Sequence, residues 1–205
     1  MRSLIISLFA LAYCMVAVAQ DFQSEARSIL SRADLSPRSR IAKIDSLYNL
    51  DQPSIEKHLP TLQGIVAQFI EQHKDSPDYP IMAMCNSRDI AQILSYHNSQ
   101  EAFHIEADKA LELAKQVEAC AEVGHLHIVL ADAAIRNGDQ KQSLKHYLKA
   151  IEIMSALNTR ETDRTVSRCY YLIANNFLNV DDMTSIQEYM REIKALSDKY
   201  DGEHH

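Results

Sequence analysis

Apolar side chains recur along this chain with the period of an α-helix. Between Gly124 and Leu157 they return every three or four residues, on both sides of the pair Asn137-Gly138. Strand signals are missing, because no turn pair of the hairpin type separates two alternating apolar runs. Alanine, leucine, isoleucine, glutamate, lysine and glutamine dominate the sequence, and all of them favour helix. The pattern therefore predicts an all-α fold.

Prolines, glycines and capping residues divide the chain into helices. We expect one helix over residues 22–33, a second from Pro37 to about Leu50, and a third from residue 53 to 73. Pro60 predicts a kink or a break in the third helix, because proline lacks an N–H group and crowds the preceding turn. After a turn at residues 76–80, helix pairs should reverse at 98–99, 137–138 and 181–182. This punctuation predicts roughly eight to ten helices in all.

The reversal at Gly138 has the clearest local signals. Gly138 can take the left-handed conformation that ends a helix. Asp139 should cap the following helix, and Gln142 three residues later completes a capping-box-like pair. Two such helices cannot bury their apolar faces alone, so the pattern indicates neighbouring helices on both sides.

Residues 124–157 resemble a tetratricopeptide (TPR) repeat. The family places a small and then a large residue in the first helix, glycine at the turn, and a small, an aromatic and a small residue in the second helix. The matching positions here are Ala131, Ala134, Gly138, Ser143, Tyr147 and Ala150. Ala134 departs from the pattern, since a bulky residue is usual there. The resemblance implies that Ala131, Tyr147 and Ala150 are buried where the two helices meet.

Two degenerate copies flank this repeat. The upstream copy carries Ala91, Leu94 and Ala110, and the downstream copy carries Ala174, Phe177 and Met190. The resemblance implies a solenoid of helical hairpins wound into a right-handed superhelix. We expect a signal peptide at 1–19, amino-terminal helices forming a degenerate repeat or cap at 20–78, about three repeats at 79–200, and a tail at 201–205.

The first residues have the pattern of a secretory signal. Arg2 precedes an uncharged apolar run from Leu4 to Val18, which closes on small residues and predicts cleavage after Ala19. The run is shorter than the ~20 residues of a membrane span. We expect export to the periplasm and no integral membrane segment after cleavage. A lipid anchor on Cys14 is the lesser alternative, because bulky Tyr13 precedes it.

The architecture is similar to the exported sensor regions of bacterial TPR-containing regulators and histidine kinases. In those proteins a signal peptide and several repeats precede a membrane helix and an output domain. The present sequence stops at His205, so it looks like such a sensor region standing alone.

Charge and cysteine usage narrow the classes of partner. The 205 residues carry a formal net charge of −7, and acidic proteins are repelled by nucleic acids and anionic membranes. Cys85, Cys120 and Cys169 lack metal-ligand spacing, and burial as small apolar side chains is favoured. One disulfide among them stays open as an alternative.

Catalytic and metal-binding motifs are missing. His125 and His127 are two residues apart on a predicted helix, so they point in nearly opposite directions and cannot share a metal. The four glycines build no phosphate loop, dinucleotide fingerprint or nucleophile elbow. We expect no metal, no cofactor and no enzymatic activity.

The resemblance also implies a partner-binding groove lined by the first helix of each repeat. The residues that it places there are Arg88, Gln92, Tyr96, His125, Asp132, Arg136, Arg168, Tyr171, Asn175 and Asn179. Arginine and tyrosine often anchor protein contacts, and arginine binds carboxylates with two hydrogen bonds. We therefore expect a protein or peptide partner of acidic character. Two alternatives stay open: a small-molecule receptor with its ligand between the helical repeats, and ordinary solvated helix residues.

Overall fold

The computed structural model describes residues 22–48, 52–97, 99–178 and 183–200. Within these ranges the chain forms helices and turns and contains no strand, which confirms the all-α prediction. The predicted signal peptide, Cys14, Asn179, the tail and the turns at 98 and 181–182 lie outside the described residues. The chain divides into two compact units, residues 1–113 and 114–205, and each is described by itself. The repeat pattern predicted a division at 78–79, and that division stays a prediction.

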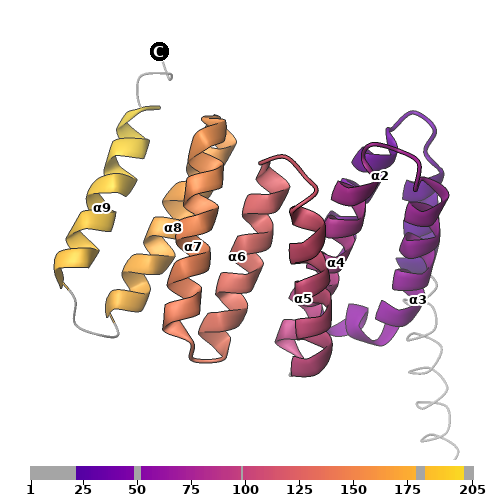
Figure 1. Cartoon of the computed structure of the whole chain (residues 1–205), viewed down its shortest axis with the longest axis horizontal. Coiled ribbons are helices and arrows are strands. Elements are labelled where there is room, and N and C mark those ends of the chain that lie inside the picture. Colours follow the sequence, from indigo (N-terminus) through magenta and orange to yellow (C-terminus); the bar gives the residue numbers. More distant parts are fainter. Residues whose placement is uncertain (1–21, 49–51, 98, 179–182, 201–205) are drawn as a thin grey trace, which may run out of the picture. The chain divides into compact units, whose positions relative to one another are not determined.

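The first unit contains a helix over residues 22–31 and the helices that follow it. These are α2 (Pro37–Tyr48), α3 (Gln52–Gln72), α4 (Tyr79–Tyr96) and α5 (Gln100–Ala114), as Figure 1 shows. Helices α2 and α3 both pack against α4. Helix α2 begins at Pro37 as predicted, and the Ser39 N–H donates to the Ser36 hydroxyl at 3.1 Å, which caps its start.

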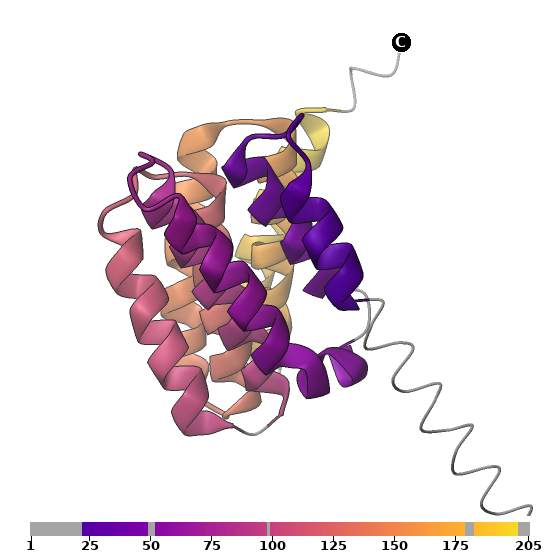
Figure 2. The same cartoon turned by 90° about the vertical axis from the view of Figure 1, so that its right-hand side faces the viewer.

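Helix α3 continues through Pro60 rather than ending there. Its first turns run at an angle to the rest of the helix, as Figure 2 shows. Leu59 and Leu62 on either side of the proline are buried, so packing holds the bend in place. Of the two predicted outcomes, a kink is therefore the one that occurs.

The described residues of the second unit form four helices that pack in the order of the sequence. Helix α6 (Ala121–Arg136) packs on α7 (Gln140–Leu157), α7 on α8 (Arg160–Leu178), and α8 on α9 (Met183–Asp198). Their core contains Ile128, Ala131, Tyr147, Ala150, Ile151, Met154, Val166, Cys169 and Ile173. The side chains of Ala131, Tyr147 and Ala150 are fully buried, which confirms the predicted burial.

The turn between α6 and α7 follows the sequence signals. Gly138 has a φ of 75°, a left-handed conformation that side chains other than glycine rarely adopt. The N–H groups of Gly138 and Asp139 donate to the carbonyls of Ile135 and Ala134, both at 2.9 Å, as in a Schellman motif. The Asp139 carboxylate accepts the Gln142 N–H at 3.0 Å. The predicted glycine stop and aspartate cap are both confirmed.

The next turn, between α7 and α8, is equally tight. Asn158 ends α7 in the left-handed conformation with a φ of 50°. Thr159 and Thr162 then cap α8 reciprocally, since each hydroxyl accepts the other residue's N–H, at 3.0 and 3.2 Å. These two short turns hold α6, α7 and α8 as consecutive antiparallel neighbours.

Candidate functional site

The hydroxyl of Tyr147 on α7 contacts a polar side chain of α6. The tyrosine ring is buried in the core of the second unit, and its hydroxyl donates a hydrogen bond to Asp132 on α6. Burial and the Asp132 carboxylate raise the pKa of Tyr147, whereas Arg168 on α8 opposes the rise. Burial likewise raises the pKa of Cys169 to about 12, with Arg168 opposing and Asp132 reinforcing. The charges of Asp132 and Arg168 therefore have opposite effects on the pKa values of Tyr147 and Cys169.

Six of the predicted groove residues lie on α6 and α8, three along each helix. We call this set the α6–α8 face and define it as His125, Asp132, Arg136, Arg168, Tyr171 and Asn175. All except half-buried Asp132 are exposed, and Tyr171 is 60% exposed. On α8, Tyr171 lies one turn after Arg168, and Asn175 lies one turn further, so the three share a stripe. The Tyr147 hydrogen bond orients Asp132, so this face presents a fixed carboxylate beside exposed guanidinium groups.

Three of the other predicted groove residues lie in the first unit, and Asn179 lies outside the described residues. Gln92 is half-buried, and Tyr96, at the end of α4, is 48% exposed. The structure gives no common surface for these residues and the α6–α8 face, because they belong to separate units.

The prediction that Arg88 presents its guanidinium on an open surface is wrong. Its side chain is only 5% exposed and is held by two carboxylates. The Arg88 Nη2 and Nε atoms lie 2.6 and 2.8 Å from Asp89 Oδ1, and Nη2 lies 3.3 Å from Asp45 Oδ2 on α2. The α2–α4 contact encloses this cluster, so Arg88 belongs to the packing of the first unit.

Sequence reasoning missed this buried cluster. Burial raises the pKa of Asp89, and the Arg88 guanidinium opposes that rise. Burial, followed by the Asp89 carboxylate, also raises the pKa of the nearby Tyr48 hydroxyl. Adjacent charges of opposite sign at 88 and 89 were the only local signal. The second carboxylate that contacts Arg88 belongs to Asp45 on α2, which is distant in the sequence.

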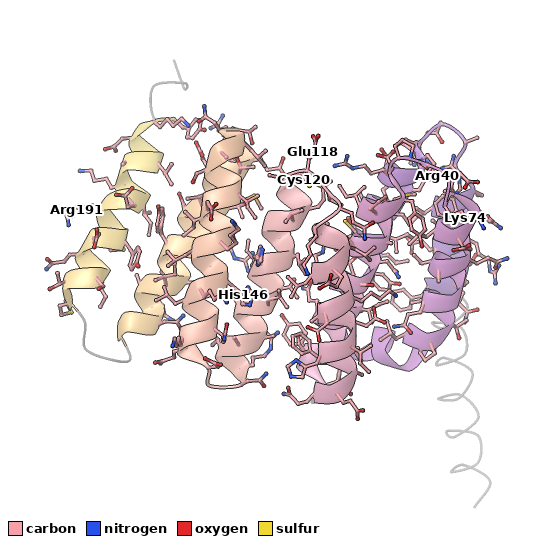
Figure 3. The ribbon with its side chains drawn as sticks, in the orientation of Figure 1. Arg40, Lys74, Glu118, Cys120, His146 and Arg191 are labelled. Carbon is pink, nitrogen blue, oxygen red and sulfur yellow. The ribbon has the colours of Figure 1, made fainter. Side chains whose placement is uncertain are left out.

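A second unforeseen feature joins α6 to α7. His127 and His146 lie with their Nδ1 atoms 3.0 Å apart and their rings stacked, 5.3 Å between centroids; Figure 3 labels His146 on α7. Burial, with the neighbouring His146 and Lys149, lowers the pKa of His127 to about 4. Burial also lowers the pKa of His146. Two neutral rings satisfy this geometry, one donating and one accepting.

Metal binding and disulfide chemistry find no support in the part of the chain that the structure describes. No group of three or more histidine, cysteine or acidic side chains there is arranged to hold a metal ion. Cys85 and Cys169 are buried, Cys120 is half-buried, and none of the three is in a disulfide. The favoured interpretation of buried apolar cysteines thus holds for Cys85 and Cys169.

A cavity of about 370 Å³ lies between α8 and α9. Its walls are formed by Arg160, Asp163, Arg164, Ser167, Ile193, Leu196, Ser197 and Tyr200. Sequence analysis singled out none of these residues as site residues. The only available signal was the pair of arginines one turn apart at 160 and 164.

Comparison with known proteins gives no identity for the chain. No model of a known protein family matches it, and no curated protein sequence matches it. Among the described helices, none combines the length and apolar character needed to cross a bilayer. The candidate site therefore rests on the geometry of the α6–α8 face and the α8–α9 cavity.

Proposed function

We propose that this chain is an exported, non-catalytic binding protein built from TPR-like helical hairpins, and that it binds a protein or peptide partner through the α6–α8 face. The observation that carries the proposal is the hydrogen bond from the buried Tyr147 to Asp132, which orients a predicted groove carboxylate among exposed predicted groove residues of α6 and α8. The repeat resemblance placed Asp132 in the groove, and the structure adds its contact with Tyr147. In a packed solenoid the first helices of successive hairpins line one surface.

The central hairpin supports the repeat architecture. Gly138 takes the left-handed turn conformation, and Ala131, Tyr147 and Ala150 are fully buried, as a TPR-like pair requires. Gly124 adds to the close approach, because a Cβ atom there would lie 2.7 Å from the Met154 side chain. Helix α8 then covers the pair from the other side, as the next hairpin of a solenoid would.

The chemistry of the face favours a carboxylate-bearing segment. Arg136 and Arg168 are exposed guanidinium groups on a protein of net charge −7. Such a local positive site attracts short anionic segments, whereas the surrounding acidic surface repels extended polyanions. Tyr171 supplies an exposed aromatic surface of the kind that anchors protein contacts. Asp132, oriented by Tyr147, disfavours a second carboxylate at its own position and so fixes the register of the bound segment.

The test compares partner capture by two matched variants. The purified protein is used as bait, and captured proteins are then purified and their Kd values measured by titration calorimetry. Arg168→Gln combined with Tyr171→Ala should weaken a partner at this face by about tenfold or more. Lys149→Gln is the control, since Lys149 is exposed on α7 and bonds Glu152 at 2.8 Å, away from the face. Equal binding by all three proteins would place the partner elsewhere.

Export has its own test. Expression in a Gram-negative host followed by mass spectrometry of the recovered protein should give a mature chain that begins at Gln20. Cys14→Ala should leave this mass and the periplasmic recovery unchanged. A lipid-modified product lost in Cys14→Ala would favour the anchored alternative, and an uncleaved chain in the cytoplasm would contradict export.

A further inference from the structure

The α8–α9 cavity combines charge with an apolar wall. Arg160 and Arg164 contribute two guanidinium groups from consecutive turns of α8, Ile193 and Leu196 contribute hydrocarbon from α9, and the Tyr200 side chain also lines the space. Its volume of about 370 Å³ falls in the range of roughly 300–1,000 Å³ that small-molecule sites occupy.

The single carboxylate in the wall already has its charge matched. Asp163 is 4% exposed, and its Oδ2 atom accepts hydrogen bonds from Lys199 Nζ and the Tyr200 hydroxyl, both at 2.5 Å. These bonds lower the pKa of Asp163, so it stays ionised and bound to Lys199. Lys199 also donates to Asn158 Oδ1 at 2.8 Å. The carboxylate of the lining is therefore committed to Lys199, and the exposed Arg164 adds a positive charge to the wall.

The arrangement around Tyr200 fixes one side of the cavity. The Arg160 guanidinium lies 5.5 Å from the centre of the Tyr200 ring, within the range of a cation–π contact. The Lys199 ammonium lies 5.2 Å from the same ring. The ring is thereby held between the end of α9 and the start of α8, next to the exposed Arg164. Ser167 and Ser197 add hydroxyl groups that can donate to a bound oxygen.

We infer that this cavity binds a small carboxylate with an apolar body, its carboxylate on Arg164 and its hydrocarbon against Ile193 and Leu196. Arginine matches a carboxylate with two parallel N–H···O bonds, and the apolar residues gain by excluding water from a hydrocarbon tail. This is a second binding activity of the second unit and does not depend on the α6–α8 face.

The experiment uses octanoate as the probe, with octan-1-ol and inorganic phosphate as matched controls. Each is titrated into ¹⁵N-labelled protein and followed by two-dimensional amide NMR. Octanoate should shift the signals of residues 160–167 and 193–200 and saturate. Octan-1-ol lacks the charge and phosphate lacks the tail, so each should bind about tenfold or more weakly.

Variants then test the two halves of the site. Arg164→Gln should weaken octanoate by about tenfold, because the charged hydrogen bonds are lost. Arg191→Gln is the control; Figure 3 shows Arg191 on the side of α9 away from α8, and its loss should leave the affinity unchanged. Ser197→Phe should fill the cavity and block binding with both arginines still in place. Circular dichroism melts establish that each variant is folded.

Several results would overturn the inference. The first is the absence of any saturable shift at the cavity residues with octanoate. Octan-1-ol or phosphate binding as tightly as octanoate would show that the site does not select a carboxylate with an apolar body. Equal weakening by Arg164→Gln and Arg191→Gln would show non-specific attraction. Arg168→Gln on the α6–α8 face should leave octanoate affinity unchanged, which separates this inference from the proposed function.

Discussion

Arg88 in the first unit and Arg168 in the second unit were both predicted to line a partner-binding groove. The structure places them in opposite environments. Arg88 is buried and holds Asp89 and Asp45, whereas Arg168 is exposed on the α6–α8 face. The difference shows that a position within a repeat does not by itself decide whether a charge binds a partner or packs inside. The environment of the arginine depends on whether a helix distant in the sequence places an opposite charge next to it.

The largest expected effect tests the core that the α6–α8 face rests upon. Ala131→Glu places a carboxylate where the side chain is fully buried among α6, α7 and α8. Overpacking and an unpaired buried charge should together cost about 4 kcal/mol or more of unfolding free energy. Urea unfolding followed by circular dichroism measures it. Leu148→Glu on the exposed side of α7 is the matched control and should cost little; equal stability of both variants would contradict the register of the hairpin.

The next effect breaks the buried charge cluster of the first unit. Arg88→Ala leaves Asp89 buried without its guanidinium partner, a kind of change that typically costs about 3–5 kcal/mol. Chemical denaturation gives the value. The double change Arg88→Met with Asp89→Asn removes both charges and should recover much of the loss. An Arg88→Ala protein as stable as wild type would mean that the cluster opens to water in solution.

Much of the fold followed from local sequence, because local chemistry controls it. The cap at Asp139 and the left-handed turn at Gly138 depend only on residues within a few positions. The burial of Tyr147 was implied by its position in the repeat resemblance. By contrast, the environment of Arg88 depends on Asp45, and the charge balance of the cavity depends on the pairing of Asp163 with Lys199. Such contacts join distant segments, and a single sequence carries no periodicity that reveals them.

In the candidate site, too, the contacts between helices could not be predicted from the sequence. The repeat resemblance selected Asp132 as a groove residue, but it gave no reason to expect that Tyr147, assigned to the core, would donate its hydroxyl to that carboxylate. Likewise His127 was considered only against His125 on its own helix, whereas its ring stacks on His146 of the next helix. Helical patterns give the face of a residue but not the neighbour across it.

The histidine pair predicts a pH dependence that belongs to the second unit. His127 has a pKa of about 4 in the folded state, against about 6.5 when unfolded. The unfolded chain therefore binds the proton more readily, so this contribution to stability is present above about pH 6.5 and is lost as the pH falls toward 4. Lys149 reinforces the lowering of the His127 pKa, and Glu152 opposes it. The pKa of His146 is lowered as well, by burial and by Lys145.

Urea unfolding at a series of pH values between 7 and 4 measures this effect. His127→Gln should flatten the decline, because the group that takes up the proton on unfolding is removed. His125→Gln is the matched control, since that side chain is exposed on the same helix and should leave the decline unchanged. An identical decline in His127→Gln would assign the acid sensitivity to other groups of the chain.

The smallest expected effect on stability completes the comparison of the two arginines. Arg168→Gln removes an exposed charge from the α6–α8 face and should change the unfolding free energy by no more than about 0.5 kcal/mol. Its measurable consequence lies elsewhere, in weaker capture of a carboxylate-bearing partner and a smaller dependence of that capture on salt. Unfolding curves and binding at two salt concentrations are measured on one preparation. A loss as large as that of Arg88→Ala would show that Arg168 also belongs to the packing, and binding through this face would then lose its principal cation.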